Sequence, residues 1–143
     1  MLQYRRLAGY RYQVMGQVEI PFKNGAFWTL PNPVNHPFFM ILPDRVIAKS
    51  AYAWDGATFA INTKNLIVPS LIHDIGCQAV NLGLLPRKYR AGFDLEYFLQ
   101  AEAYGVCMPR AAFHFAVIRL WGMIPKRERG IAPYAKVYSV RVR

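Results

Sequence analysis

The sequence has little cysteine, little acid and no long apolar run. Its two cysteines, Cys77 and Cys107, are too few for a disulfide scaffold and do not have the spacing of a zinc site. We therefore expect two buried thiols in a reducing compartment. Since no run of about 18 uncharged apolar residues occurs, we expect no membrane-spanning helix. The first residues lack the apolar stretch that follows the charges of a secretion signal, so we expect no such signal.

Acidic residues are scarce relative to basic ones. Eight acids stand against 18 lysines and arginines, which gives a net charge of +10 at pH 7. Residues 126–143 alone contain six basic residues and one acid. This balance favours anionic partners, such as nucleic acid, an anionic polymer of a cell envelope or an acidic protein. The alternative is a charged, solvated face with no specific partner.

The length of 143 residues is that of one domain, and it is enough to bury a core without disulfides or a structural metal. The chain is 54% apolar and 15% aromatic, which favours a dense core or a surface that binds a partner. We predict a single α+β domain over residues 1–124 and a basic C-terminal extension over residues 125–143, whose last residues (137–143) could form an edge strand.

The first half of the chain has the pattern of strands and turns. Apolar residues predict strands at 14–22, 26–30, 38–42 and 45–53. Asn24-Gly25 predicts a hairpin between the first two, since Asn-Gly readily adopts positive φ. Pro31–Pro37 contains three prolines, so we expect a loop without ladder hydrogen bonds.

The second half predicts three helices. They run from near Pro69 to Val80, from about Arg87 to Tyr104, and from near Pro109 to Gly122. The third has almost no polar face, so we expect it to be the central and most buried helix. Strands first and helices second indicate an α+β fold, in which an N-terminal antiparallel β region packs against three C-terminal helices.

The candidate site is centred on His73-Asp74, an adjacent histidine and carboxylate in an otherwise apolar run. Such groups are costly to bury unless they bind each other, a metal or a proton-transfer partner. Asp94 lies on the next helix, four residues after Arg90, and Asp55 ends the preceding strand. We therefore predict that one histidine and three carboxylates converge. These ligands suit Zn, Mn, Mg or Fe, and such an ion with a spare carboxylate would support metal-assisted hydrolysis.

A purely structural network is the alternative. In that case a carbonyl group or Asp55 would hold His73, and a backbone amide or Arg90 would hold Asp74. Asp94 would be no more than the ion-pair partner of Arg90, four residues earlier on the helix. No further histidine has the spacing to reach the site: His36 lies in the proline loop and His114 in the third helix. A serine nucleophile is less favoured, because Ser70 is not in a Gly-x-Ser-x-Gly elbow.

Four short motifs, taken in order, resemble a family of phage and prophage proteins known as domain-of-unknown-function family 1353. They are Trp54-Asp-Gly-Ala-Thr58, Leu71-Ile-His-Asp-Ile75, Arg90 with Asp94 and Phe98, and Val117-Ile-Arg-Leu-Trp-Gly122. The resemblance implies a phage or prophage origin, in the virion or the host cytoplasm. It singles out Asp55, His73, Asp74, Arg90 and Asp94, and it implies no particular reaction.

Three functions follow as hypotheses. The first is a metal-assisted hydrolase with His73, Asp74, Asp94 and Asp55 as ligands or base, and with Arg90 orienting Asp94 or an anionic substrate. The second is a structural or interaction protein of the virion or tail. The third is a nucleic-acid accessory protein that binds phosphate through its basic extension without reading sequence.

Overall fold

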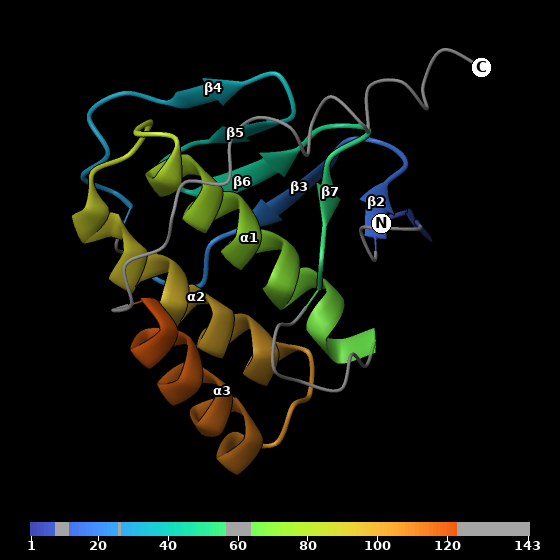
Figure 1. The fold of residues 1–143 in the computed structure, drawn as a ribbon, viewed down its shortest axis with the longest axis vertical. Coiled ribbons are helices and arrows are strands. Elements are labelled where there is room, and N and C mark those ends of the chain that lie inside the picture. The colour runs from blue at the N-terminus through green and yellow to red at the C-terminus, as the bar shows by residue number, and fades with distance from the viewer. Residues whose placement is uncertain (8–11, 26, 57–63, 123–143) are drawn as a thin grey trace.

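The fold is α+β, as the sequence predicts: antiparallel sheets form the N-terminal half and three helices the C-terminal half (Figure 1). It was obtained as a computed structural model that describes residues 1–7, 12–25, 27–56 and 64–122. The basic extension and the edge strand expected at its end lie outside these residues. Within them, no helix is long and apolar enough to cross a membrane.

A three-stranded sheet lies at the N-terminus. Its order is β1 (Tyr4–Arg6), β2 (Tyr12–Val14) and β7 (Ala53–Trp54), all antiparallel. The aromatic rings of Tyr4, Tyr12 and Trp54 gather on it, and the ring centroids of Tyr12 and Trp54 are 5.3 Å apart. This packing fixes Trp54, the residue that precedes the predicted site residue Asp55.

A four-stranded antiparallel sheet provides most of the β layer. Its order is β3 (Val18–Pro21), β6 (Arg45–Ala48), β5 (Phe39–Ile41) and β4 (Val34–His36). Ile20 and Ile41 both pair with Val46, and all three side chains are buried. The sheet therefore presents one apolar face, which the helices cover.

Several strand predictions require correction. The predicted 14–22 strand is divided between the two sheets by a bend at Met15-Gly16, and the 45–53 strand is interrupted at Ala51, which has a φ of +75°. The loop prediction for Pro31–Pro37 is wrong in its centre, because β4 lies between the prolines. It is an edge strand, where proline is tolerated.

The hairpin predicted at Asn24-Gly25 does not form. β3 pairs with β6 instead, and residues 27–30 form a turn. The reason is a long-range contact: the buried Glu96 carboxylate accepts hydrogen bonds from the backbone N–H groups of Lys23 and Asn24, at 2.8 and 3.1 Å, and from the Asn24 side chain. The backbone N–H groups at this turn therefore bond to a side chain of a distant helix and not within a hairpin.

The three helices lie where the sequence places them. They are α1 (Ile67–Asn81), α2 (Arg90–Ala103) and α3 (Met108–Gly122), with short 3₁₀ turns at Lys64–Leu66 and Arg87–Tyr89. Gly83 and Gly105 end the first two with φ of +73° and +84°. That conformation closes the last helical turn and favours glycine.

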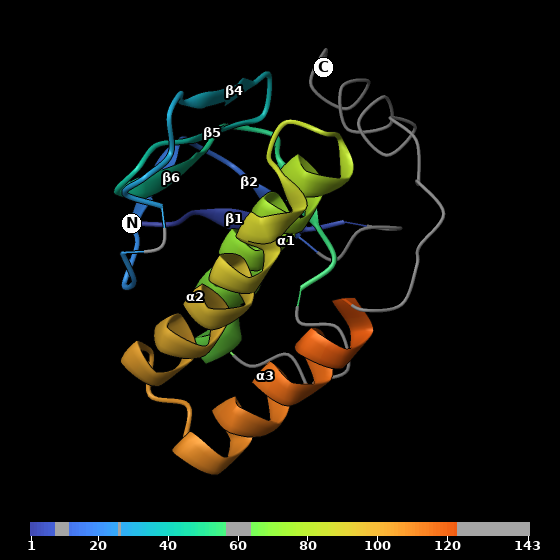
Figure 2. The same ribbon diagram turned by 90° about the vertical axis from the view of Figure 1, so that its left-hand side faces the viewer.

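The prediction that the third helix is the most buried is wrong. Only one side of α3 is buried, through Ala111, His114 and Ile118, and it packs against α2. The most buried helix is α1, and α1 and α2 lie side by side against the sheets, whereas α3 is the helix farthest from the sheets (Figures 1 and 2). A helix with almost no polar face is normally covered on every side, so the exposed apolar side of α3 is unusual.

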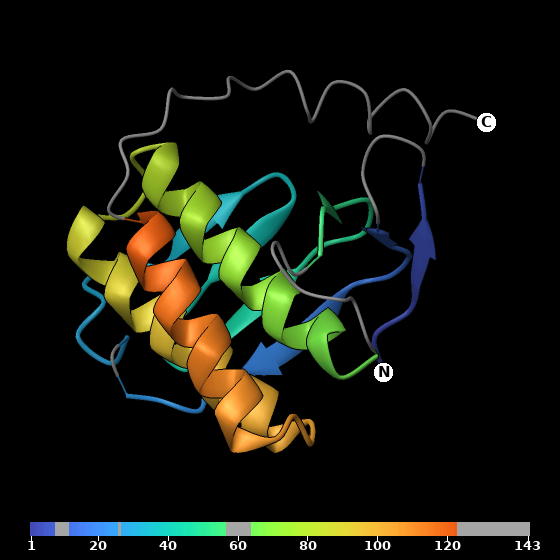
Figure 3. The same ribbon diagram turned by 60° about the horizontal axis from the view of Figure 1, so that its bottom comes forward.

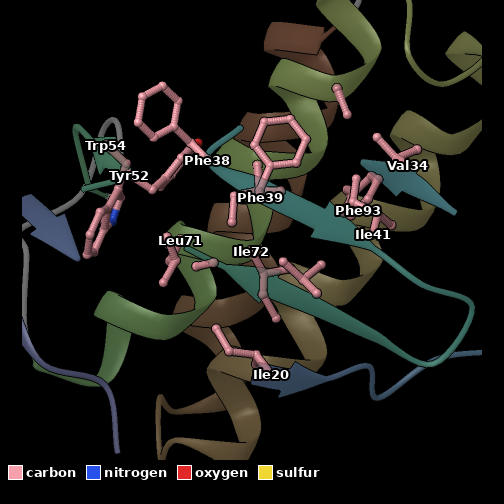
Figure 4. Packing of buried hydrophobic residues seen from close by; sticks show 14 of the residues in the cluster. Ile20, Val34, Phe38, Phe39, Ile41, Tyr52, Trp54, Leu71, Ile72 and Phe93 are labelled. Carbon is pink, nitrogen blue, oxygen red and sulfur yellow. The ribbon is translucent and has the colours of Figure 1, made fainter. Parts of the chain in front are cut away.

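The main core lies between the four-stranded sheet, α1 and α2. Phe39 and Ile41 from β5 meet Ile72 from α1 and Phe93 from α2, and all four side chains are fully buried (Figure 4). A second, smaller cluster joins α2 to α3. The candidate site lies between these two cores, where the helices contact one another.

Candidate functional site

The strand end and the first helix are joined by a buried hydrogen bond. The indole Nε1 of Trp54 donates to Ser70 Oγ at 3.1 Å, and the Ser70 hydroxyl donates to the Ile67 carbonyl at 3.0 Å. This places Asp55, next in the chain, beside the start of α1. Both bonding functions of Ser70 are therefore used structurally, and nothing in this geometry favours it as a nucleophile.

A glycine allows α1 and α2 to approach closely. A Cβ atom on Gly76 would lie 2.1 Å from Cγ of Phe93, so the aromatic ring occupies the place of a side chain. The helices are antiparallel, since His73 contacts Asp94 and Tyr97 while Gly76 contacts Phe93. The close approach brings side chains one turn away, at His73, within hydrogen-bonding distance of α2.

The centre of the site is the carboxylate of Asp94, which is fully buried and has three cationic or ionisable partners. His73 Nε2 donates to Oδ1 at 2.7 Å, Arg90 Nε donates to the same oxygen at 3.1 Å, and Arg119 Nη1 donates to Oδ2 at 2.9 Å. These bonds lower the pKa of Asp94 despite its burial. One carboxylate thus connects α1, α2 and α3.

The pKa of His73 is raised in the folded protein. Burial alone would lower the pKa of its imidazole, but the neighbouring Cys77 sulfur and the hydrogen bond to Asp94 raise the pKa of His73 to about 10. The Cys77 Sγ lies 3.6 Å from both ring nitrogens, so it contacts the ring without facing one nitrogen alone. With Nε2 bound to Asp94, Nδ1 is the ring nitrogen that remains for other chemistry.

Asp74 and Asp55 form the second part of the site. Burial raises the pKa of Asp74 to about 7, against the lowering effect of His73; the charge of Asp55 raises it further, and a hydrogen bond from the Asp55 backbone opposes this rise. Asp74 is half-buried and Asp55 is exposed. The structure therefore brings all five predicted residues into one region, with Asp94 in its interior and Asp55 at the solvent.

The geometry gives little support to the predicted role of these residues as metal ligands. Among the described residues, no group of three or more His, Cys, Asp or Glu side chains is arranged to hold a metal ion. The Asp94 oxygens are occupied by two arginines and His73, so Asp94 is better described as the partner of His73 than as a ligand. Asp74 and Asp55 remain as two neighbouring carboxylates, which fit a hard cation that keeps several waters, such as Mg²⁺, better than four-coordinate Zn²⁺.

Several site residues were not singled out from the sequence. Arg119 comes from α3, and its only signal was its place as a charge in an apolar helix and in the last of the four motifs. Cys77 follows His73 by four residues, a spacing that puts both on one helix face. It is only partly buried and Cys107 is exposed, so the expectation of two buried thiols is wrong.

A second histidine lies closer to the site than the sequence suggested. His114 is buried and its Nδ1 lies 3.1 Å from the Tyr97 hydroxyl, whose ring edge packs against His73 with centroids 5.7 Å apart. Burial and the charge of Arg110 lower the pKa of His114, so it stays neutral at pH 7. His36 lies in β4, in the four-stranded sheet, and is not among the partners of Asp94.

Comparisons with protein-family models, with curated proteins and with solved structures give no match. The resemblance to the phage and prophage family therefore stays a prediction. What can be argued about function rests on the geometry of the site.

Proposed function

We propose that the protein is a hydrolase in which His73 transfers protons and Asp94 orients it, with a divalent cation held by Asp74 and Asp55. The supporting observation is the 2.7 Å bond between His73 Nε2 and a fully buried carboxylate on another helix. A histidine fixed at one nitrogen by a carboxylate presents its other nitrogen, Nδ1, in one tautomer and one orientation.

Arg90 and Arg119 set the electrostatics of this pair. They neutralise Asp94 from α2 and α3, so the carboxylate stays ionised and can stabilise an imidazolium. Both are positioning residues, since they act on His73 through Asp94. Arg119 is 35% exposed and so is also available to an anionic substrate.

Asp74 and Asp55 would hold the cation, which supplies charge stabilisation at a carbonyl or phosphoryl oxygen. Asp74 is next to His73 in the chain and the two charges interact, so positive charge bound there would lower the pKa of His73 from about 10 towards neutrality. His73 then accepts a proton from water at Nδ1 and returns it to the leaving group. We therefore expect activity to require added Mg²⁺ or Mn²⁺.

The test uses the full chain with Mg²⁺ or Mn²⁺, first in titration calorimetry and then with activated esters and phosphodiesters as substrates. His73→Asn should lower activity by about 100-fold or more. The matched control is His114→Gln, which alters another buried histidine with one hydrogen-bond partner and should keep activity. Unchanged activity in His73→Asn, or no cation binding by the parent protein, would refute the proposal.

A non-enzymatic interaction protein, for example a virion component, is the second candidate. It is favoured by one observation: the exposed side of α3 is apolar, as a surface that packs against a neighbour would be. In that case His73→Asn would only lower stability. A phage or prophage origin is likewise a proposal, supported by the four sequence motifs alone.

Nucleic-acid binding by the basic extension is a third proposal, supported by charge. The extension lies outside the described residues, so no geometry bears on it. Binding to random DNA that weakens steeply with salt, and that is lost on truncation after Ile124, would favour it. Full binding by the truncated chain would refute a role for the extension.

A further inference from the structure

The outer side of α3 is apolar along its whole length. Every exposed residue within Met108–Gly122, all of which the structure describes, is apolar. Among the large side chains, the most exposed are Met108, Phe113 and Leu120, whose exposed fractions are 61, 62 and 65%. Phe113, Ala116 and Leu120 follow at intervals of three and four residues, so they form one stripe. An apolar stripe of this length in contact with water indicates a surface that is covered in function.

The stripe belongs to the outermost helix of the molecule. α3 lies in front of α1 and α2 in Figure 3, on the side away from the four-stranded sheet. Its inner side, at Ala111, His114 and Ile118, is used for packing against α2. An outermost helix with an exposed apolar side can lie on a lipid surface, which needs no matching groove.

The charges of the protein indicate what kind of surface α3 would bind. The C-terminal end of α3 adjoins exposed basic residues: Arg87 Nη2 donates to the Gly122 carbonyl at 3.4 Å, and Lys88 follows Arg87 in the chain. Of the four exposed acids of the described part, Glu19 and Asp44 are neutralised by Arg45 on the sheet, and the other two are Asp55 and Glu102. With a net charge of +10, a second copy of the chain would be repelled, and an anionic membrane would be attracted.

We propose that α3 is a membrane-docking helix that lies in the interface of an anionic lipid bilayer, with Met108, Phe113 and Leu120 inserted. The proposal does not depend on the hydrolase function. The two are connected in space, because Arg119 of the same helix binds Asp94, so docking would hold the candidate site close to the membrane surface.

The test is sedimentation of the full chain with vesicles of phosphatidylglycerol or of phosphatidylcholine at physiological salt. The parent protein should bind phosphatidylglycerol vesicles at least tenfold more tightly than phosphatidylcholine vesicles. Phe113→Ser/Leu120→Ser should weaken that binding by about tenfold or more, since it removes apolar surface and leaves every basic residue in place. Because both side chains are exposed, the double variant should fold, which its circular dichroism and thermal unfolding will check.

The matched control is Trp28→Ser/Leu84→Ser, which removes exposed apolar side chains of 75 and 41% exposure that are not part of α3, and it should bind like the parent. Four results would overturn the proposal: binding to neither vesicle, equal binding to both, undiminished binding by the α3 double variant, or an equal loss in the control. A dimer that the α3 double variant abolishes would assign the stripe to a second copy and would also overturn it.

Discussion

Replacing Asp94 by Asn should be among the most destabilising conservative substitutions in the chain. The Asp94 side chain is fully buried, and its oxygens bind His73 at 2.7 Å, Arg119 at 2.9 Å and Arg90 at 3.1 Å. Asn keeps the shape but removes the charge, so the cationic partners lose their counter-charge. Breaking a buried pair in this way costs about 3–5 kcal/mol. Because Arg119 is 35% exposed and can be hydrated, we expect about 3 kcal/mol, a large share of the roughly 5–15 kcal/mol that stabilises a domain.

The pH dependence of this loss has a definite sign. The pKa of Asp94 is lowered in the folded protein, so its contribution to stability is present above the ordinary value of 3.8 and is lost as the pH falls. The pKa of His73 is raised to about 10, so the contribution of His73 is present below 6.5 and is lost as the pH rises through 10. The difference in stability between parent and Asp94→Asn should therefore be largest near pH 5–6.5 and should shrink in acid and above pH 10.

Urea unfolding followed by circular dichroism, at several pH values, measures this difference. The control is Asp44→Asn, which removes an exposed carboxylate paired with Arg45 and should leave the unfolding midpoint unchanged. A loss below about 1 kcal/mol for Asp94→Asn, or the same loss at pH 6 and pH 10.5, would refute the conclusion that this carboxylate is the electrostatic centre of the helical half.

Three further substitutions test the packing around the site. Gly76→Ala should destabilise the protein by about 2 kcal/mol in urea unfolding, because the added Cβ would meet the Phe93 ring, although alanine favours a helix by about 1 kcal/mol. Adding Phe93→Leu to this variant should restore part of the lost stability. A Gly76→Ala variant more stable than the parent would contradict the close approach of the two helices. Glu96→Ala should lower the free energy of unfolding by about 2–3 kcal/mol and accelerate amide hydrogen exchange at Lys23, as measured by mass spectrometry. Unchanged exchange at Lys23 would contradict the hydrogen bond between its backbone N–H and Glu96. Asp74→Asn should raise the free energy of unfolding by about 1–2 kcal/mol at pH 8 and leave it unchanged at pH 3.5. The reason is that burial raises the pKa of Asp74 to about 7, so ionisation above that pH destabilises the folded state. Thermal unfolding at both pH values measures the difference, and an equal effect at the two pH values would refute the reasoning.

Much of the helical half could be read from sequence because its signals are local. Gly83 and Gly105 end α1 and α2 by adopting positive φ, and the spacing of Arg90 and Asp94 places them on one face of α2. The strands were read less well. β3 pairs with β6 and not with the segment after Asn24-Gly25, because Glu96, far along the chain, binds the backbone of that turn.

The sequence by itself determined the α+β order, the helix limits and the choice of His73, Asp74 and Asp94, since periodicity, caps and isolated polar residues in apolar runs act over a few residues. Tertiary structure alone decided how these groups combine: that Asp94 holds His73 from a second helix and that Arg119 reaches it from a third. It also decided that α3 covers α2 with one side and exposes the other. The physical reason is that hydrogen bonds and burial between distant segments depend on which helix faces meet, and close approach at Gly76 sets that choice for α1 and α2.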